Sequence, residues 1–327
     1  MASSAPPRDE VRRFIVENRP VRGHWVRLEG AWRELRAHRD YPEPVRDLLG
    51  QAVAASVLLA ATLKFHGQLT LQLQGNGAVS LLVAQCTHDF RLRAVARYDQ
   101  AVIEALASPD TAAPARRAAA KPEELVGNGG LFRRLVGSGG RFAVTVEADE
   151  RKARYQGIVP LGGDSLAGSL EAYFAASEQL PTRVLLAADG DRGGGVLVQK
   201  LPEDAAADDS QVGEIWAQAE RGIARLSAED LLQRPVEELL GRGFADHDMR
   251  LFRGAPVQFE CRCSQGRVTS LLRALGPEEV RDVLREQGSV TVTCEFCYRP
   301  YRFGEGDVQA LFADDSPAGS DNPSTIH

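Results

Sequence analysis

Leu69-Thr70-Leu71-Gln72-Leu73-Gln74 alternates apolar and polar side chains and runs into the turn sequence Gly75-Asn76-Gly77. A second alternating run follows the turn, with Val79, Leu81 and Val83 at every other position. Because successive side chains of a strand point to opposite faces, this pattern predicts a β-hairpin with one buried face. The stretch therefore predicts an antiparallel sheet at the centre of the fold.

The residues on either side of this hairpin predict a helix and further strands. From Asp40 to Leu63 the apolar side chains recur every three or four residues, which is typical of a helix. Alternation returns at 91–98 and at 142–146, which indicates two more strands. The other expected elements are strands at 155–161, 184–186 and 195–201 and a helix capped by Ser165. We therefore expect an α+β fold, with residues 8–202 forming an N-terminal domain that has a mainly antiparallel sheet and packed helices.

Residues 203–259 are predicted to form an acidic, helical linker of marginal stability. The part from 203 to 248 carries a net charge of −8, whereas the whole chain carries −6. It contains a capping box at Ser227 and Asp230 and an apolar stripe that Pro235 interrupts. The stripe consists of Leu231, Leu232, Val236, Leu239 and Leu240. It needs a partner surface, and we expect the N-terminal sheet to supply it because the domain that follows is too small.

Four of the five cysteines form two closely spaced pairs near the C-terminus. Cys261 and Cys263 are two residues apart, and after thirty intervening residues Cys294 and Cys297 follow with CxxC spacing. Side chains two apart in an extended segment share a face, and CxxC is typical of a zinc knuckle. Since four thiolates suit tetrahedral zinc, the sequence predicts one Zn²⁺ per chain, bound in the reduced state by a domain at 260–313.

The region between the two cysteine pairs carries little apolar surface of its own. Its expected helical face consists of Leu271, Leu272, Leu275, Val280 and Val283. That core is too thin to fold about sixty residues alone, so the metal is expected to be structural. The fifth cysteine, Cys86, stands alone at the end of a strand and is interpreted as a small core residue. The polar segment at 314–327 is expected to be a disordered tail.

Composition narrows the classes of function. The net charge of −6 argues against binding to nucleic acid or to a membrane surface, since both normally need a basic excess. No apolar signal core follows the first residues, and the longest apolar run, at 52–61, is too short to span a bilayer. These observations predict a cytoplasmic protein. Thiols stay reduced there, so paired cysteines indicate metal or redox chemistry.

Several motifs together point to a known family. The CxC and CxxC pairs include Cys294-Glu295-Phe296-Cys297, followed by Tyr301 and Phe303. Other motifs are spread along nearly the whole chain, at 21–23, 38–42, 60–65, 73–77, 154–157 and 177–183. In these motifs the chain resembles the redox-regulated heat-shock holdases of bacteria, also called the 33 kDa chaperonin family. It departs from the family pattern in an insertion at 105–121 and in a duplicated glycine motif at 125–140.

The resemblance implies an ATP-independent molecular chaperone without enzymatic activity. It implies that the reduced, zinc-bound form is inactive, and that oxidation releases zinc and unfolds the linker. The disulfides that it implies are Cys261–Cys263 and Cys294–Cys297. It implies unfolding client proteins as partners and a homodimer as the active form. In that scheme the apolar stripe of the linker gates the binding of clients.

The two implied disulfides would stabilise the domain much less than zinc does. Each closes a very short loop and contributes at most about 2 kcal/mol by chain entropy. Structural zinc contributes roughly 10–16 kcal/mol of binding free energy. Oxidation to these pairs is therefore expected to unfold the domain, whereas a cross-pair such as Cys263–Cys294 closes a longer loop and would lack that effect.

A constitutive zinc-ribbon module that binds nucleic acid is the main alternative. Seven arginines between Arg262 and Arg302 favour it, but acidic residues lie among them and leave no uncompensated basic patch. A zinc enzyme is less favoured, because four thiolates leave no open position for water or substrate. An electrophoretic shift assay with and without peroxide distinguishes the nucleic-acid binder from the chaperone.

Overall fold

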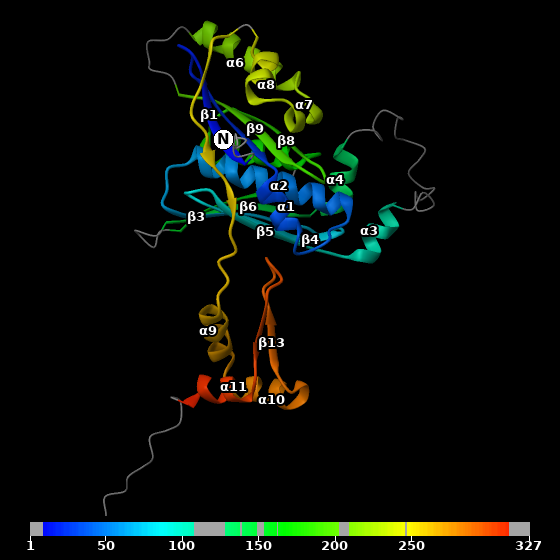
Figure 1. The fold of residues 1–327 in the computed structure, drawn as a ribbon. Coiled ribbons are helices and arrows are strands. Elements are labelled where there is room, and N and C mark those ends of the chain that lie inside the picture. The colour runs from blue at the N-terminus through cyan, green and yellow to red at the C-terminus, as the bar shows by residue number, and fades with distance from the viewer. Residues whose placement is uncertain are drawn as a thin grey trace, which may run out of the picture. The chain divides into compact units, whose positions relative to one another are not determined.

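Figure 1 shows the computed structural model of the chain, which divides into two units, Met1–Glu260 and Cys261–His327. The structure describes residues 9–107, 128–137, 139–148, 154–161, 163–202, 209–245 and 247–313. Most of the insertion at 105–121, the start of the linker, residues 125–127 of the first glycine motif and the segment at 314–327 lie outside the described residues. Each unit is described by itself below.

The first unit contains two mainly antiparallel sheets. Sheet A has the strand order β10-β1-β2-β9-β8, and β11 also pairs with β1. Its strands are β1 (Glu10–Val16), β2 (Val21–Leu28), β8 (Thr182–Ala188), β9 (Gly193–Lys200), β10 (Met249–Leu251) and β11 (Ala255–Pro256). Sheet B has the order β12-β5-β4-β3-β6-β7. Its strands are β3 (Gly67–Gln74), β4 (Val79–Thr87), β5 (Arg91–Tyr98), β6 (Arg141–Ala148), β7 (Arg154–Pro160) and β12 (Gln258–Phe259).

The expected hairpin is the β3–β4 pair of sheet B. The two strands pair antiparallel around the predicted turn, with Leu73 opposite Leu82. Leu69, Leu71 and Leu73 are fully buried, as the alternation indicated. On β4 the expected face is wrong after Val79, because a bulge between Val79 and Leu81 turns the alternate residues from Leu82 onward into the core. Cys86 on β4 is also fully buried in this core, and burial raises the pKa of its thiol. It therefore packs as the predicted small core residue.

Helix α2 (Glu43–Thr62) lies between the two sheets, as Figure 1 shows. Its side chains join those of sheets A and B in one apolar core. Among the described residues, α2 is the one helix with the length and hydropathy of a membrane span, and most of it is buried in the unit. Its apolar surface is thus accounted for by the packing of the two sheets on it.

Shorter helices complete this unit. They are α1 (Gly30–Arg36), α3 (Gln100–Ala107), α4 (Asn128–Val136) and α5 (Leu166–Tyr173), which continues into the π-helical turn η3 (Phe174–Glu178). The expected cap of α5 is present, since Ser165 Oγ accepts a hydrogen bond of 3.0 Å from the Gly168 amide.

The opposite face of sheet A is covered by three helices of the linker segment, α6 (Asp209–Ala224), α7 (Ala228–Gln233) and α8 (Val236–Gly243). Strand β9 shows why both faces need a cover: Val196 and Val198 pack against the linker helices, whereas Leu197 packs toward α2. The predicted capping box of α7 is present at Ser227 and Asp230.

The linker segment is not helical to its end, which corrects the expectation of a helical linker throughout 203–259. After α8 the chain is extended, and it adds β10 and β11 to sheet A and β12 to sheet B. Strand β12 pairs with β5 in parallel, with Phe259 opposite Leu92. The segment is thus held to both sheets by backbone hydrogen bonds, which side-chain periodicity does not reveal.

The second unit is built on two helices, a short hairpin and a final helix. Its elements are α9 (Gln265–Leu275), α10 (Pro277–Gln287), β13 (Val290–Thr293), β14 (Pro300–Phe303) and α11 (Glu305–Leu311). Leu272 and Val280 are buried as predicted, but Leu271 and Leu275 are 52% and 51% exposed. The core is completed by Val268, Val290, Phe303, Val308, Leu311 and Phe312. The hairpin and α11 cover one side of α9, so the other side remains in solvent.

Candidate metal centre

The four late cysteines come from two places in the second unit. Cys261 and Cys263 lie in the extended segment between β12 and α9, where Ser264 caps the helix. Cys294 and Cys297 lie in the turn that joins β13 to β14. In this turn the Tyr298 amide donates to the Cys294 carbonyl at 2.8 Å, and the Cys294 amide donates to the Arg299 carbonyl at 3.0 Å. The tight turn brings both of its cysteines to one side of the hairpin.

The four sulfur atoms lie within 4.8 Å of one another. The shortest separations join the two segments: Cys261 Sγ lies 3.6 Å from Cys294 Sγ, and Cys263 Sγ lies 3.4 Å from Cys297 Sγ. A tetrahedron with zinc–sulfur bonds of about 2.3 Å has sulfur–sulfur edges of about 3.8 Å. The sulfur arrangement therefore fits a tetrahedral metal ion, and all five cysteines of the chain are free thiols. The described residues contain no other cluster of three or more metal-ligating side chains.

The thiols differ in how readily they ionise. Burial acts to raise the pKa of Cys263, but the hydrogen bond from Tyr301 Oη and those from the neighbouring thiols outweigh it and lower the pKa to about 7. Tyr301 Oη lies 3.0 Å from Cys263 Sγ. Burial raises the pKa of Cys261 and of Cys297. In the metal-free site, Cys263 is thus the thiol that is favoured to become a thiolate near neutral pH.

Tyr301 is a site residue that the spacing of the cysteines did not predict. It appeared in the sequence only as part of a family motif, and nothing in its local pattern indicates a hydrogen bond to sulfur. It lies on β14 opposite Val292 of β13, which orients its hydroxyl toward Cys263. The hairpin register therefore supplies a partner for the metal ligands.

The apolar stripe of the linker belongs to the first unit, whereas the four cysteines belong to the second. Its five side chains are between 0 and 6% exposed and pack on sheet A, in a cluster that includes Phe14, Trp25 and Val198. Polar contacts add to this packing. Arg27 of β2 donates to the Leu231 carbonyl at 3.1 Å, and Arg192 donates to the Leu232 carbonyl at 3.1 Å. Neither arginine could be predicted from the sequence, because their partners are backbone carbonyls that no sequence motif marks.

Comparison with known proteins supports one family for the whole chain. The family model described as Hsp33 protein matches residues 9–304. The 33 kDa chaperonin of Chromobacterium violaceum is 38% identical, over 95% of this chain and 96% of the relative. That of Nitrosococcus oceani is 40% identical, over 94% of this chain and 95% of the relative.

The fold agrees with a solved structure of the same family. The crystal structure of the 33 kDa chaperonin from Thermotoga maritima superposes with a TM-score of 0.73 at 23% identity, and the match covers 94% of this chain and all of that one. At this low sequence identity, the similarity to the solved structure shows the fold alone. Together with the sequence relatives and the four-cysteine cluster, it leads to one assignment: the chain belongs to the Hsp33, or 33 kDa chaperonin, family, which is a family of chaperones and not of enzymes.

Proposed function

We propose that this protein is a redox-regulated, ATP-independent holdase that binds Zn²⁺ through Cys261, Cys263, Cys294 and Cys297 in its reduced state. The observation that carries the proposal is the cluster of four free thiols within 4.8 Å of one another in a unit with a small apolar core. Soft thiolate ligands in a closed set of four favour structural zinc over metals that need oxygen ligands. Bound zinc would tie the segment before α9 to the β13–β14 turn.

Oxidation is proposed to dismantle this site through its thiols. Cys261 and Cys263 form one disulfide, and Cys294 and Cys297 form the other. Each disulfide forms when two thiols lose two electrons and two protons, which hydrogen peroxide takes up as it is reduced to two water molecules. The shortest sulfur–sulfur distances now run between the two pairs. The sulfurs must therefore rearrange before the within-pair disulfides form, and the turn at Cys294 must change shape.

The linker is proposed to transmit this change to a surface that binds clients. Sheet A has an apolar outer face with Phe14, Trp25, Val196 and Val198, all of which the linker helices cover. Release of the linker exposes both the stripe and this face, and apolar patches of several hundred Å² mark interaction sites. We propose that unfolding proteins bind there, that the active form is a homodimer and that the protein acts in the cytoplasm.

Hydrogen exchange tests where oxidation unfolds the chain. After peroxide treatment, the amides of Leu271–Val283 are expected to lose their protection, because the small second core no longer has a metal to stabilise it. The amides of Leu69–Val83 are expected to keep theirs, since that hairpin lies in the large core of the first unit. Aggregation of a model client and zinc release are followed in the same samples. Equal loss of protection in both segments would contradict a local switch.

Replacing Tyr301 with Phe is expected to weaken zinc binding by about 10- to 100-fold, the usual effect of losing a hydrogen bond to a ligand. The hydroxyl donates to Cys263 Sγ at 3.0 Å and thereby favours the thiolate. Its loss raises the pKa of Cys263 above about 7, so this part of the defect should be small at alkaline pH, grow as the pH falls toward 7 and level off below it. Competition with a chromophoric chelator at several pH values measures the affinity. Tyr155→Phe, which removes a hydroxyl from β7 in the first unit, is the control, and an unchanged affinity in Tyr301→Phe would rule out this contribution.

A further inference from the structure

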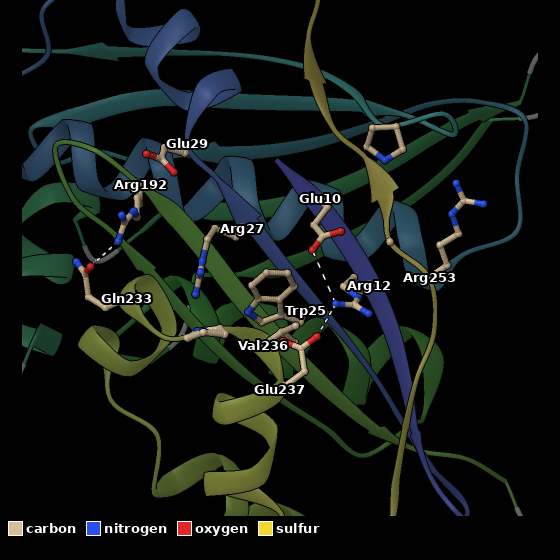
Figure 2. Close-up of a pocket in the computed structure, with 13 residues that line it drawn as sticks. Glu10, Arg12, Trp25, Arg27, Glu29, Arg192, Gln233, Val236, Glu237 and Arg253 are labelled. Carbon is tan, nitrogen blue, oxygen red and sulfur yellow. Dashed lines mark hydrogen bonds and ion pairs between the residues drawn. The ribbon is translucent and has the colours of Figure 1, made fainter. Parts of the chain in front are cut away.

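A cavity of about 880 Å³ lies in the first unit, between sheet A and the linker segment (Figure 2). One wall is formed by β1 and β2, with Arg12, Trp25 and Arg27. The linker contributes the region from Gln233 to Glu237, and the extended chain after β10 contributes Arg253. Arg192, from the turn between β8 and β9, closes the remaining side. Residues far apart in the sequence therefore bring four guanidinium groups to one cavity.

Two of these guanidinium groups lack a carboxylate partner although they lie close together. Within the described residues, Arg27 and Arg192 form no ion pair; both donate instead to backbone carbonyls of α7. Burial lowers the pKa of Arg27 and repulsion from Arg192 lowers it further, while attraction to Glu29 and Glu10 offsets part of this effect. Two half-buried cations that repel each other and have no carboxylate of the described chain within salt-bridge distance favour the entry of an anion.

The carboxylates of the cavity are held by other cations. Glu237 pairs with Arg12 at 2.9 Å, and Glu10 lies 4.0 Å from the same guanidinium. Glu29 pairs with Arg33 at 3.7 Å. These ion pairs weaken the repulsion that the three carboxylates would exert on a bound anion.

Buried donors without acceptors mark the same wall of the cavity. Trp25 is 3% exposed, and within the described residues its indole Nε1 has no hydrogen-bond acceptor. The Nε of Arg27, whose guanidinium lies 5.1 Å from the Trp25 ring, has none either. Buried polar groups normally have partners, and an unsatisfied donor is unfavourable. Figure 2 shows Trp25 between Arg27 and Arg12. Both donors therefore lie at the guanidinium group of Arg27, which has no carboxylate within salt-bridge distance in the part of the chain that the structure describes.

We propose that this cavity binds a phosphate-type dianion at the pair Arg27 and Arg192. Guanidinium groups match the geometry of phosphate oxygens with paired hydrogen bonds, and a dianion neutralises two adjacent cations better than a single carboxylate does. Arg253 is exposed at the other end of the cavity, beyond Glu10 and Arg12 in Figure 2, and does not belong to this pair. The volume exceeds that of one phosphate group, which leaves room for pyrophosphate or for a small phosphorylated molecule.

The bound anion would join sheet A to the β8–β9 turn while Arg27 and Arg192 keep hold of α7. It would stabilise the docked linker, because any ligand that binds only one state shifts the equilibrium toward that state. This regulatory consequence rests on the proposed function, in which undocking activates the chaperone. The binding of the anion to the cavity is independent of the proposed function.

The indole N–H signals of the three tryptophans test the site directly. In a ¹H–¹⁵N spectrum of the reduced full chain, titration with inorganic phosphate or pyrophosphate should move the Trp25 signal in a saturable way. Trp32, whose Nε1 donates to the Asp189 carbonyl at 3.0 Å, and Trp216 should not move. Sodium chloride at equal ionic strength is the control for screening. A Trp25 signal that stays fixed, or that follows ionic strength alone, would overturn the proposal.

Arg192→Gln supplies the matched variant, since it removes one of the two cations while its side-chain amide can still donate to the Leu232 carbonyl. Calorimetry should show about a tenfold or greater loss of pyrophosphate affinity, as expected for one hydrogen-bonded charge. Arg250→Gln removes a guanidinium that pairs with Glu17 and does not line the cavity, and it should bind as the parent does. Equal losses in both variants would show nonspecific charge attraction and contradict the site. If pyrophosphate binds as expected but leaves hydrogen exchange of α7 and α8 unchanged, the site stands and its link to the linker is refuted.

Discussion

Replacing Leu239 and Leu240 with Glu is expected to make the reduced, zinc-bound protein suppress the aggregation of an unfolding model protein. The two leucines are 0% and 3% exposed on sheet A, and removing their apolar burial costs roughly 3–6 kcal/mol. Two further negative charges would also enter a segment that is already acidic. The loss should exceed the docking free energy of a marginal element, so the linker leaves the sheet without oxidation.

The control for this variant adds the same charge without removing buried area. Ala224→Glu with Ala228→Glu changes two exposed positions of α6 and α7 and should leave the reduced protein inactive. Zinc content and light scattering of the client are measured for both double variants. If the Leu239→Glu, Leu240→Glu protein retains its zinc and is as inactive as the parent, the linker is not the gate, and the switch acts through the second unit alone.

The second large effect is expected from Cys261→Ser combined with Cys294→Ser, which removes one sulfur from each pair. These sulfurs lie 3.6 Å apart on the two segments that the metal would join. With two thiolates left, the site should lose most of a binding free energy of roughly 10–16 kcal/mol, and the second unit should unfold. Metal analysis should find no zinc, and near-ultraviolet circular dichroism should show loss of tertiary structure.

Cys86→Ala is the matched control, because it removes a thiol that is buried in the first core and far from the cluster in sequence. It should keep one zinc per chain. Zinc retained at one equivalent by the double serine variant would refute the four-thiolate site and, with it, the proposed switch. Loss of zinc without unfolding would instead show that the second core is sufficient by itself.

Local patterns predicted those parts of the fold in which one face of an element is buried. The alternation at Leu69–Leu73, the turn at Gly75–Gly77 and the capping box at Ser227 each depend on neighbouring residues only, and all three are present. Each cysteine pair was recognised by its spacing in the same way, whereas the joining of the two pairs was inferred from the four ligands that zinc prefers. These local features could be predicted because the physical requirement and the residues that meet it lie within a few positions of each other.

The sequence did not show what covers each face. Helical spacing grouped Leu271 and Leu275 with Leu272, but the covering residues, Phe303 and Leu311, come from the hairpin and helix beyond the last cysteine. These partners lie on the Leu272 side, so the other two leucines are exposed.

The cavity lined by Arg27 and Arg192 was missed for a related reason. Its walls come from strands, a turn and a linker whose proximity depends on the pairing of the whole sheet. Long-range pairing of this kind is the step that single-sequence patterns cannot supply.

The pairing of β12 with β5 has a consequence for the kinetics of the linker. The Leu201 amide donates to the Pro20 carbonyl at 2.7 Å, and the Glu260 amide donates to the Leu92 carbonyl at 2.9 Å, so the linker is fixed to the first unit at both ends. While both anchors hold, a released linker is a closed loop of roughly 55 residues and not a dangling tail, and doubling its length would cost only about 0.6 kcal/mol of closure entropy. Its return to sheet A is then intramolecular and independent of protein concentration. Recovery after stress should follow first-order kinetics, and extra residues inserted into the loop should slow it only slightly.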